Sequence, residues 1–414
     1  MSQENDRQLP DGWQWVKLGE LIQVAQPGFA CGERDVQGVI QLRMNNLDTR
    51  GNLIWDDFIR IPATTDQILK YKLATNDVVF NNTNSTELVG NSALFVEQKE
   101  PVVYSNHFTK IRTITEKLEP SYLSSWLVHQ WQKGTFSNLC NRWIGQSAVK
   151  NDKLLDLLIP LPPLSEQKRI AAILNEQMEA VEKARKATEA QLEAAKALPA
   201  AYLRAVFESE EANSWERRKL GEICQSNGQY GTSEKSTNVN QGLPVLRMGN
   251  IIEGKINWSD LMYVNLPTDE ETKFLLKKGD VLFNRTNSAE LVGKTAVFDA
   301  EFKAVFASYL IRFKMRYNLA DPYYISAYIN SRQGRKFIEA NMTRAIGQVN
   351  ISASTMYNMP IPIPPTLEKQ KQIASTLTEQ MQEVERLKQN LKEQLDTINK
   401  LPAVLLRRAF KGEL

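Results

Sequence analysis

The sequence has few of the residues that build metal sites and disulfides, with two histidines and three cysteines among 414 residues. Cys31, Cys140 and Cys224 are far apart and odd in number, so they do not form a disulfide framework. With so few histidines beside them, we expect no metal site. No apolar run approaches the roughly 20 residues of a membrane-spanning helix, and residues 1–10 lack the apolar core of a secretory signal. We therefore expect a cytoplasmic protein.

The net charge is also small, because 51 Lys and Arg against 48 Asp and Glu leave +3. This balance permits DNA binding without indicating it. A content of 42% hydrophobic and 24% charged residues is typical of a folded globular protein and excludes disordered and fibrous classes. The length exceeds that of one typical domain, so the chain should hold several.

The sequence contains an internal tandem repeat. Residues 77–95 read DVVFNNTNSTELVGNSALF, and 203 positions later residues 280–298 read DVLFNRTNSAELVGKTAVF. Nearly the same offset recurs along the chain, for example where Ile144-Gly145-Gln146 returns as Ile346-Gly347-Gln348. This periodicity predicts two homologous halves fused in tandem.

Each half is predicted to contain a compact α/β domain followed by a long helix. Short β-rich runs alternate with Gly, Asn and Pro turns until the proline strings at 160–163 and 362–365. Pro199 and Pro402 should break or kink the helices, which begin near Ser165 and Leu367. The predicted boundaries are 1–163 and 212–366 for the two mixed α/β domains, and 164–211 and 367–414 for the two helical regions.

Apolar residues recur every seven positions in both long helices, as in a coiled coil. Equal length and glutamines at matched positions suit two helices related by a pseudo-twofold axis, which makes the predicted pair antiparallel. The residues predicted to pair the helices are Leu174, Val181, Leu377, Val384, Leu387, Leu391 and Ile398.

Two strings resemble catalytic motifs but lack the surroundings that catalysis needs. Asp321-Pro322-Tyr323-Tyr324 is similar to the amine-binding signature of amino-methyltransferases, yet its counterpart begins Glu119-Pro120, and in both copies the acidic residue and proline should open a helix. Gly293-Lys294-Thr295 would complete a phosphate-binding loop only with a glycine where Ser288 stands. We therefore assign no catalytic residue.

Two matched polar loops follow apolar strands and are candidates for DNA contact. Their side chains suit phosphate oxygens and base edges, although Asn and Ser could instead cap their own backbone in a turn. Arg285 replaces Asn82, and Arg pairs with guanine where Asn prefers adenine, so this position should distinguish the copies. The two loops are Asn81, Asn82, Thr83, Asn84 and Ser85, and Asn284, Arg285, Thr286, Asn287 and Ser288.

Other candidates occupy matched places in the two copies. Residues 229–235 take the place of residues 27–33 and differ almost completely from them. Positions identical in both copies suit scaffolding or phosphate contact, whereas positions that differ suit reading of different sequences. These further candidates are Arg142 and Gln146, Arg344 and Gln348, Tyr230, Thr232, Ser233 and Lys235, and the matched pair Arg43 and Arg247.

The whole chain resembles the specificity subunit of type I restriction-modification systems. The marks are the doubled layout, the proline strings followed by the similar segments 165–171 and 368–374, and the ending LRRAFKGEL at residues 406–414. The resemblance implies that each α/β domain is a target recognition domain that reads one half of a bipartite double-stranded DNA target. It also implies that the helices set the spacing of the halves and dock two modification subunits.

On this resemblance the chain is not catalytic by itself and holds no cofactor. Methyl transfer from S-adenosylmethionine would belong to the modification subunits, and translocation and cleavage with ATP and Mg²⁺ to restriction subunits. A two-domain scaffold that binds protein or RNA instead of duplex DNA is the alternative, and residue spacing does not separate the two.

Overall fold

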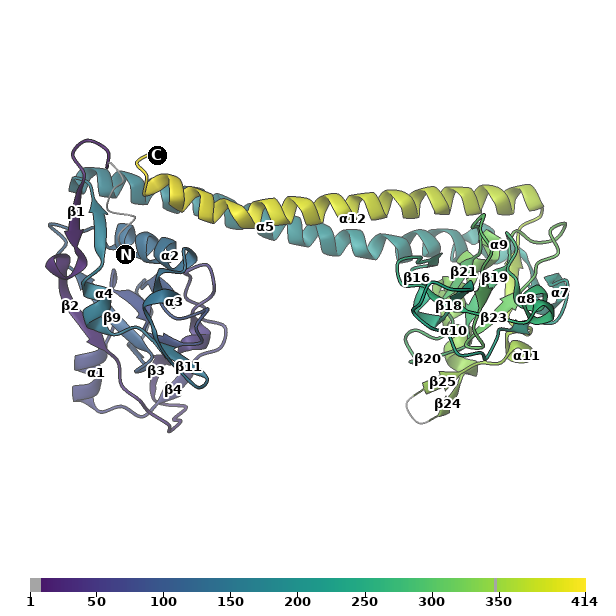
Figure 1. Ribbon diagram of the computed structural model, residues 1–414, viewed down its shortest axis with the longest axis horizontal. Coiled ribbons are helices and arrows are strands. Elements are labelled where there is room, and N and C mark those ends of the chain that lie inside the picture. The colour runs from purple at the N-terminus through teal and green to yellow at the C-terminus, as the bar shows by residue number, and fades with distance from the viewer. Residues whose placement is uncertain (1–8, 346–347) are drawn as a thin grey trace. The chain divides into compact units, whose positions relative to one another are not determined.

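The computed structural model describes residues 9–345 and 348–414 (Figure 1). Residues 1–8, which make up most of the segment searched for a secretory signal, and the repeat residues Ile346 and Gly347 lie outside the described residues. The chain forms two compact units, each of which contains one α/β domain and parts of both long helices. Unit 1 comprises Met1–Thr188 and Glu393–Leu414, and unit 2 comprises Glu189–Lys392.

Two sheets and a covering helix build the domain of unit 1. The central antiparallel sheet has the order β2-β9-β5-β7, and the second sheet has the order β4-β3-β8, with β3 parallel to β8. Helix α2 (Pro120–Gln132) packs on β7 and β5. The bounds are β2 Ile22–Pro27, β3 Val39–Leu42, β4 Ile59–Ile61, β5 Val78–Asn81, β7 Ser92–Leu94, β8 Val102–Tyr104, β9 Phe108–Thr113, α1 Thr65–Tyr71, α3 Thr135–Leu139 and α4 Asn151–Leu155.

Unit 2 repeats the topology of these two sheets and adds a two-stranded sheet, β16-β17. Its central sheet has the order β14-β23-β19-β21, and its second sheet β18-β15-β22 again contains one parallel pair, β15 with β22. The predicted tandem repeat is thus confirmed in the fold. The bounds are β14 Gln229–Tyr230, β15 Leu243–Leu246, β16 Ile251–Ile252, β17 Lys255–Ile256, β18 Met262–Val264, β19 Val281–Asn284, β21 Thr295–Val297, β22 Val305–Phe306, β23 Leu310–Phe313, α6 Glu210–Ser214, α7 Leu220–Ile223, α8 Thr268–Phe274, α9 Pro322–Asn330, α10 Arg332–Asn341 and α11 Ala353–Met356.

The proline strings form one strand of a two-stranded antiparallel sheet in each unit. Strand β12 (Leu158–Leu161) pairs with β1 (Gln14–Lys17), and β26 (Pro360–Ile363) pairs with β13 (Glu216–Lys219). Proline is tolerated there because a strand with only one neighbour leaves the other edge without ladder bonds. The long helices begin directly beyond these strands.

Helices α5 (Leu164–Phe207) and α12 (Leu367–Ala409) begin within one residue of the predicted positions. Of the predicted break or kink at Pro199 and Pro402, the break is wrong, because both prolines lie inside continuous helices. The residues that follow each proline are anchored in a hydrophobic core, Leu203 in unit 2 and Leu406 in unit 1, and this packing outweighs the lost backbone hydrogen bond. Among the described residues no helix is long and apolar enough to cross a membrane.

Each unit joins the start of one long helix to the end of the other. In unit 1, Ile170 and Leu174 near the start of α5 share a core with Leu406 and Ala409 near the end of α12. In unit 2, Leu377 near the start of α12 shares a core with Phe207 and other residues at the end of α5. The predicted antiparallel pairing of the helices is therefore confirmed.

The repeat every seven residues predicts two seam rows in α12, Leu377, Val384, Leu391 and Ile398 in the first and Ile373, Gln380, Leu387, Gln394 and Leu401 in the second. The structure agrees with the first row and shifts the second by one residue at Leu387. Leu377, Val384 and Leu391 are 3%, 2% and 4% exposed, as a buried row requires, whereas Leu387 is 42% exposed and does not lie in the seam. The second row instead lies four residues after each member of the first, and it includes Lys388, whose side chain is 12% exposed. Of the remaining predicted pairing residues, Leu174 is buried, and Val181 and Ile398 are half-buried.

Candidate nucleic-acid interface

A small three-stranded sheet in each unit brings two of the predicted polar sets together. In unit 1, strand β6 of the first polar loop pairs with β11, so that Thr83 lies opposite Ala148 and Asn84 opposite Ser147. Unit 2 pairs β20 with β25 in the same register. The hairpins that carry Arg142 and Arg344 are therefore direct extensions of the polar loops. The bounds are β6 Thr83–Asn84, β10 Asn141–Trp143, β11 Gln146–Ala148, β20 Thr286–Asn287, β24 Thr343–Ala345 and β25 Gln348–Asn350.

Several of the predicted contact residues are buried inside their own domain. The amide of Asn82 donates to the Asn106 carbonyl at 3.2 Å and to Thr109 Oγ1 at 3.0 Å, and the hydroxyl of Thr286 donates to the Asn350 side chain. Such bonds hold the loop rather than offering groups to a ligand. The buried members are Asn81, Asn82, Thr232, Asn284 and Thr286.

The turn-forming alternative accounts for a further matched pair. Asn84 Oδ1 accepts a hydrogen bond from the Ser85 backbone N–H, and Asn287 Oδ1 accepts one from Ser288, each at 2.8 Å. These side chains stabilise the turn that follows β6 and β20. Their free amide N–H groups, together with the half-buried Thr83, remain at the surface of the loop.

The remaining predicted residues lie at least partly at the surface. Arg142 donates to the Ser137 carbonyl at 3.0 Å, which leaves the other guanidinium nitrogens for a ligand. Half-buried are Arg43, Thr83, Asn84, Ser85, Arg247, Arg285 and Asn287, and exposed are Arg142, Gln146, Tyr230, Ser233, Lys235, Ser288, Arg344 and Gln348.

Arg43 and Arg247 occupy matched positions at the ends of β3 and β15. Arg43 Nη2 donates to the Cys31 carbonyl at 2.7 Å, and Arg247 Nη2 lies 3.4 Å from Asp260 Oδ2. The Nε of each guanidinium is buried without a partner. Burial lowers the pKa of Arg43, and the nearby charge of Arg34 lowers it further. Arg43 in unit 1 and Arg247 in unit 2 are thus matched cations whose hydrogen-bonding capacity is only partly used.

Arg285 joins two loops that the sequence could only treat separately. Its guanidinium carbon lies 4.7 Å from the ring centroid of Tyr230, a cation–π contact that holds the guanidinium against the ring. The Tyr230 hydroxyl is itself held, because it accepts a hydrogen bond from the Ala353 backbone N–H at 3.2 Å. The loop at 229–235 and the loop at 284–288 therefore form one surface, which has no equivalent stacked pair at Asn82.

The loops that differ most in sequence are aligned by a shared glycine. A Cβ atom at Gly28 would lie 2.3 Å from the Tyr104 carbonyl oxygen, and one at Gly231 would lie 2.1 Å from the Phe306 carbonyl oxygen. Only glycine allows this approach, so Gly231 corresponds to Gly28. The sequence comparison, which set residue 229 against residue 27, was one residue out of register here.

Sequence reasoning missed Trp143 and Ile144 at the tip of the β10–β11 hairpin. Trp143 is 60% exposed, and Ile144 is fully exposed. Gly145, with a φ of 82°, makes the turn. The string Arg142-Trp143-Ile144-Gly145 could have indicated this apolar tip, because a large aromatic next to a turn glycine has little chance of burial.

The segment Asp321-Pro322-Tyr323-Tyr324, which is similar to a methyltransferase motif, has a structural role. Asp321 Oδ1 accepts hydrogen bonds from the backbone N–H groups of Tyr323 and Tyr324, each at 3.0 Å, and so caps the start of α9. Across residues 9–345 and 348–414 there is no group of three or more His, Cys, Asp or Glu that could hold a metal ion. All three cysteines are free.

The fold and the loops define a protein with two similar domains, each presenting polar and cationic loops of different sequence. The family of type I restriction modification DNA specificity domains matches this chain twice, at residues 10–193 and 213–397. The chain therefore belongs to the DNA specificity subunits of type I restriction-modification systems and carries two target recognition domains.

Relatives of known name span nearly the whole chain. The putative type I restriction enzyme MjaX specificity subunit of Methanocaldococcus jannaschii is 26% identical over 95% of this chain and 92% of its own length. The type I restriction enzyme EcoKI specificity subunit of Escherichia coli strain K12 is 24% identical over 98% of this chain and 90% of its own length.

Solved structures share the fold. The crystal structure of the HsdS subunit from Thermoanaerobacter tengcongensis superposes with a TM-score of 0.63 at 24% identity, over 99% of this chain and 100% of the other. A chain from a study of complex assembly and conformational transition of the type I system gives a TM-score of 0.70 at 24% identity, over 99% of this chain and 100% of the other.

Proposed function

We propose that the domain of unit 1 and the domain of unit 2 each read one half of a bipartite duplex-DNA target. The observation that carries this proposal is the repeated sheet that joins a polar loop to a cationic hairpin in both units. An internal repeat suits a target with two halves, and loops that differ within a shared scaffold suit two different half-sequences.

Matched cations are best suited to contact phosphates. Arg43 and Arg247, and likewise Arg142 and Arg344, stand at equivalent places in both units, and phosphates are the feature that both half-sites share. Base reading then falls to residues that differ between the copies and reach the surface. In unit 2 these are Arg285 with Tyr230, Ser233 and Lys235, and in unit 1 the exposed Trp143 offers an apolar contact for the bases.

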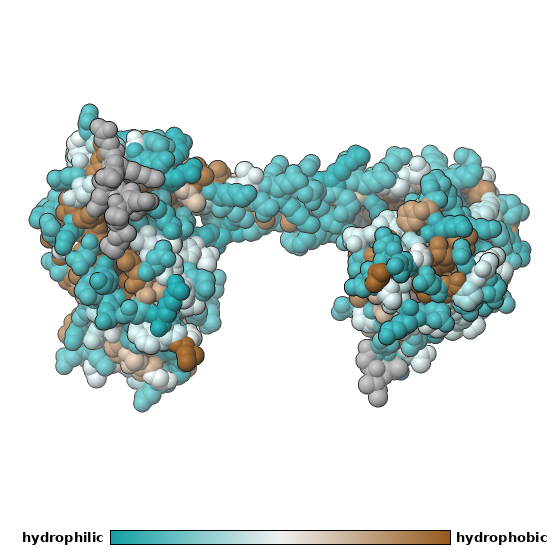
Figure 2. Space-filling view, viewed as in Figure 1, coloured by the Kyte–Doolittle hydropathy of each residue, from teal (hydrophilic) through white to brown (hydrophobic). Residues whose placement is uncertain are grey.

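The paired helices set the spacing of the half-sites and dock two modification subunits. Their exposed surface is mostly hydrophilic (Figure 2), which suits polar contacts with partners that also exist outside the complex. S-adenosylmethionine would act in those subunits, ATP and Mg²⁺ in restriction subunits, and the assembly would work on DNA in the cytoplasm. This chain would contribute target choice alone.

Methylation mapping tests the proposal in the assembled complex. Host DNA would be sequenced for methylated adenines with the intact gene, without it, and with residues 229–235 exchanged for another loop of equal length. We expect a bipartite motif that depends on the gene, and a change confined to one half of the motif in the loop variant. A motif that does not depend on the gene, or methyl transfer by the isolated chain, would contradict the proposal. Preferential binding of RNA would favour the scaffold alternative.

A further inference from the structure

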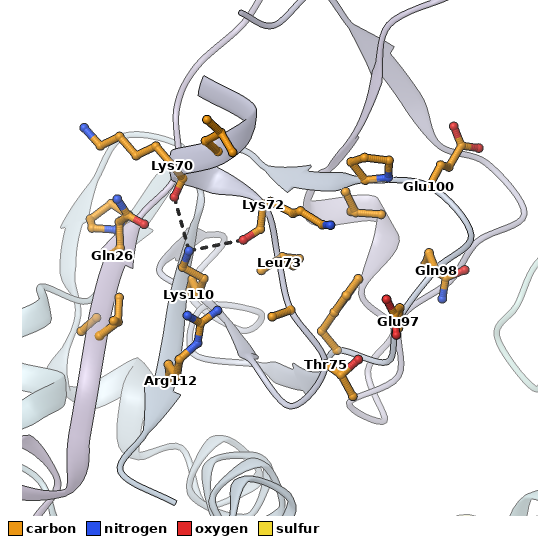
Figure 3. Close-up of a pocket in the computed structure, with 18 of the residues that line it drawn as sticks. Gln26, Lys70, Lys72, Leu73, Thr75, Glu97, Gln98, Glu100, Lys110 and Arg112 are labelled. Atoms are coloured by element: carbon orange, nitrogen blue, oxygen red, sulfur yellow. Dashed lines mark hydrogen bonds between the residues drawn. The ribbon is translucent and has the colours of Figure 1, made fainter. Parts of the chain in front are cut away.

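Unit 1 contains a cavity that lies outside the predicted DNA-contact loops. It has a volume of about 1040 Å³ and opens between β2, helix α1, β9 and the segment 97–102 (Figure 3). Cationic side chains outnumber anionic ones around it, and Glu100 is already bound by Arg60 at 2.6 and 2.8 Å. The charged lining residues are Lys70, Lys72, Lys99, Lys110, Arg112, Glu97 and Glu100.

Lys110 lies at the base of this cavity with weak internal partners. It is 5% exposed, and its ammonium donates only to the carbonyls of Lys70 and Lys72, at 3.4 and 3.5 Å. Its distance to the Tyr104 ring centroid is 5.7 Å. Burial lowers the pKa of Lys110. The nearest acid, Asp77, is bound by two nitrogens of Arg112 at 2.7 and 2.8 Å.

The matched residue in unit 2, Arg312, has more partners than Lys110, although its Nε is buried without one. Arg312 donates to the Leu275 carbonyl at 2.7 Å and to the Lys273 carbonyl at 3.0 Å, which correspond to the two carbonyls that Lys110 reaches. It also pairs with Asp280 at 3.3 Å and bonds to Gln229. Arg312 thus bonds to one anion and three neutral acceptors, whereas the Lys110 ammonium has two long contacts and lies beside an open cavity.

We propose that the cavity of unit 1 binds a small phosphate-bearing anion through the Lys110 ammonium. A buried cation whose neighbouring anion is already bound by another cation costs free energy, and an incoming phosphate would supply a further negative charge. Lysine binds phosphate as a point charge, and Lys72 and Arg112 also line the cavity, whereas the Lys70 side chain points away from Lys110 (Figure 3). This site does not depend on the proposed reading of DNA halves.

Titration calorimetry of the full chain with inorganic pyrophosphate, in the absence of DNA, tests the proposal. We expect binding to the unaltered chain and a loss of about tenfold or more in affinity for Lys110→Met, as for loss of a hydrogen bond to a charged group. Lys110→Arg should also weaken binding, because the guanidinium can occupy both carbonyls, and it should fold because arginine stands at the matched position. Lys150→Met, an exposed lysine outside the cavity, is the control and should bind as the unaltered chain does.

The outcomes separate the sources of the phosphate. Displacement of pyrophosphate by a non-target duplex would identify a DNA backbone phosphate as the occupant, and no displacement would identify a free anion. The absence of binding at millimolar pyrophosphate, or equal binding by Lys110→Met and the unaltered chain, would overturn the proposal. Failure of the methylation test above would leave this measurement unaffected.

Discussion

The two copies bury the same aspartate at the start of the central strand but neutralise it differently. Asp77 is paired with Arg112, whose side chain is 38% exposed, whereas Asp280 is paired with Arg312, whose side chain is 3% exposed. The pKa shifts of the paired groups reflect this difference in exposure. The hydrogen bond that Arg112 donates to Asp77 raises the pKa of Arg112, while burial lowers the pKa of Arg312 and raises that of Asp280. A buried charge can therefore change its partner between copies, provided that some cation remains close.

Other contacts are the same in both copies, and they join each domain to its helix. Gln167 accepts a hydrogen bond from the Glu119 N–H at 2.9 Å and donates to the Lys117 carbonyl at 3.0 Å. Gln370 makes the same two bonds to Asp321 and Leu319, each at 3.0 Å. Both glutamines are 1% exposed. The join between domain and helix thus stays fixed, while the charge pairs and loops around it diverge.

The largest expected effect on stability comes from removing the arginine of the Asp77–Arg112 pair or of the Asp280–Arg312 pair. Arg312→Met leaves Asp280 buried and unpaired, and should reduce the free energy of unfolding by about 3–5 kcal/mol. Arg112→Met should reduce the free energy of unfolding clearly less, because water reaches the Arg112 side of the Asp77–Arg112 pair. Urea denaturation of the two variants measures the difference. Equal losses would show that the exposure of the pair does not decide its contribution.

The helix seam gives the next largest effect and contains its own control. Leu391→Asp places a charge at a position that is 4% exposed and should reduce the free energy of unfolding by roughly 2–4 kcal/mol. Leu387→Asp, at a position that is 42% exposed, should change it by less than about 0.5 kcal/mol. Denaturation and assembly with modification subunits both report the outcome. Similar losses for the two variants would restore the seam row that the sequence predicted.

An acid-dependent effect should be confined to unit 1. His129 stacks on Phe410 with 5.4 Å between ring centroids, and burial, aided by the charge of Arg407, lowers its pKa to about 4. As the pH falls below about 6.5, His129 becomes protonated in the unfolded chain but stays neutral in the folded chain. The free energy of unfolding therefore falls as the pH drops from about 6.5 towards 4. The loss should reach roughly 3 kcal/mol at most.

Replacing the histidine isolates this contribution. His129→Phe keeps the aromatic stack on Phe410 and removes the titrating group, so the fall in stability between pH 6.5 and 4 should become shallower. Ser331 stands at the matched position of unit 2, and Ser331→Ala serves as the control that should leave the slope unchanged. Identical pH slopes for His129→Phe and the unaltered chain would show that His129 does not carry the acid dependence.

Sequence patterns predicted the features that depend on local chemistry. The offset of the repeat, the helix starts after the proline strings and the cap at Asp321 all follow from neighbouring residues. The seam row was misjudged because Leu387 is more apolar than Lys388, although the aliphatic stem of the lysine fits the seam and its ammonium reaches Glu385 and Glu253.

Tertiary packing decided the features that the sequence could not show. Asn81 and Asn284 look like surface residues after a strand, yet they are 2% and 0% exposed because the loop folds back over them. The contact of Arg285 with Tyr230 joins residues 55 positions apart, and no spacing rule predicts it. The site was therefore predictable as a set of loops, and the side chains that reach its surface were not.

The smallest expected effect concerns which copy reads which base. Arg285 is held against the ring of Tyr230, where its guanidinium could pair with O6 and N7 of guanine. Arg285→Asn should therefore reduce discrimination in one half-site only, by about 1–3 kcal/mol. Asn82→Ala is the matched change in unit 1. Because the amide of Asn82 is buried and bonded to Asn106 and Thr109, this change should mainly lower the stability of the fold and should have little effect on base choice. Binding to a panel of single-base variants at fixed salt measures both. Equal weakening against every sequence after Arg285→Asn would assign this arginine to a phosphate, and a half-site change after Asn82→Ala would show that the loop opens when it meets DNA.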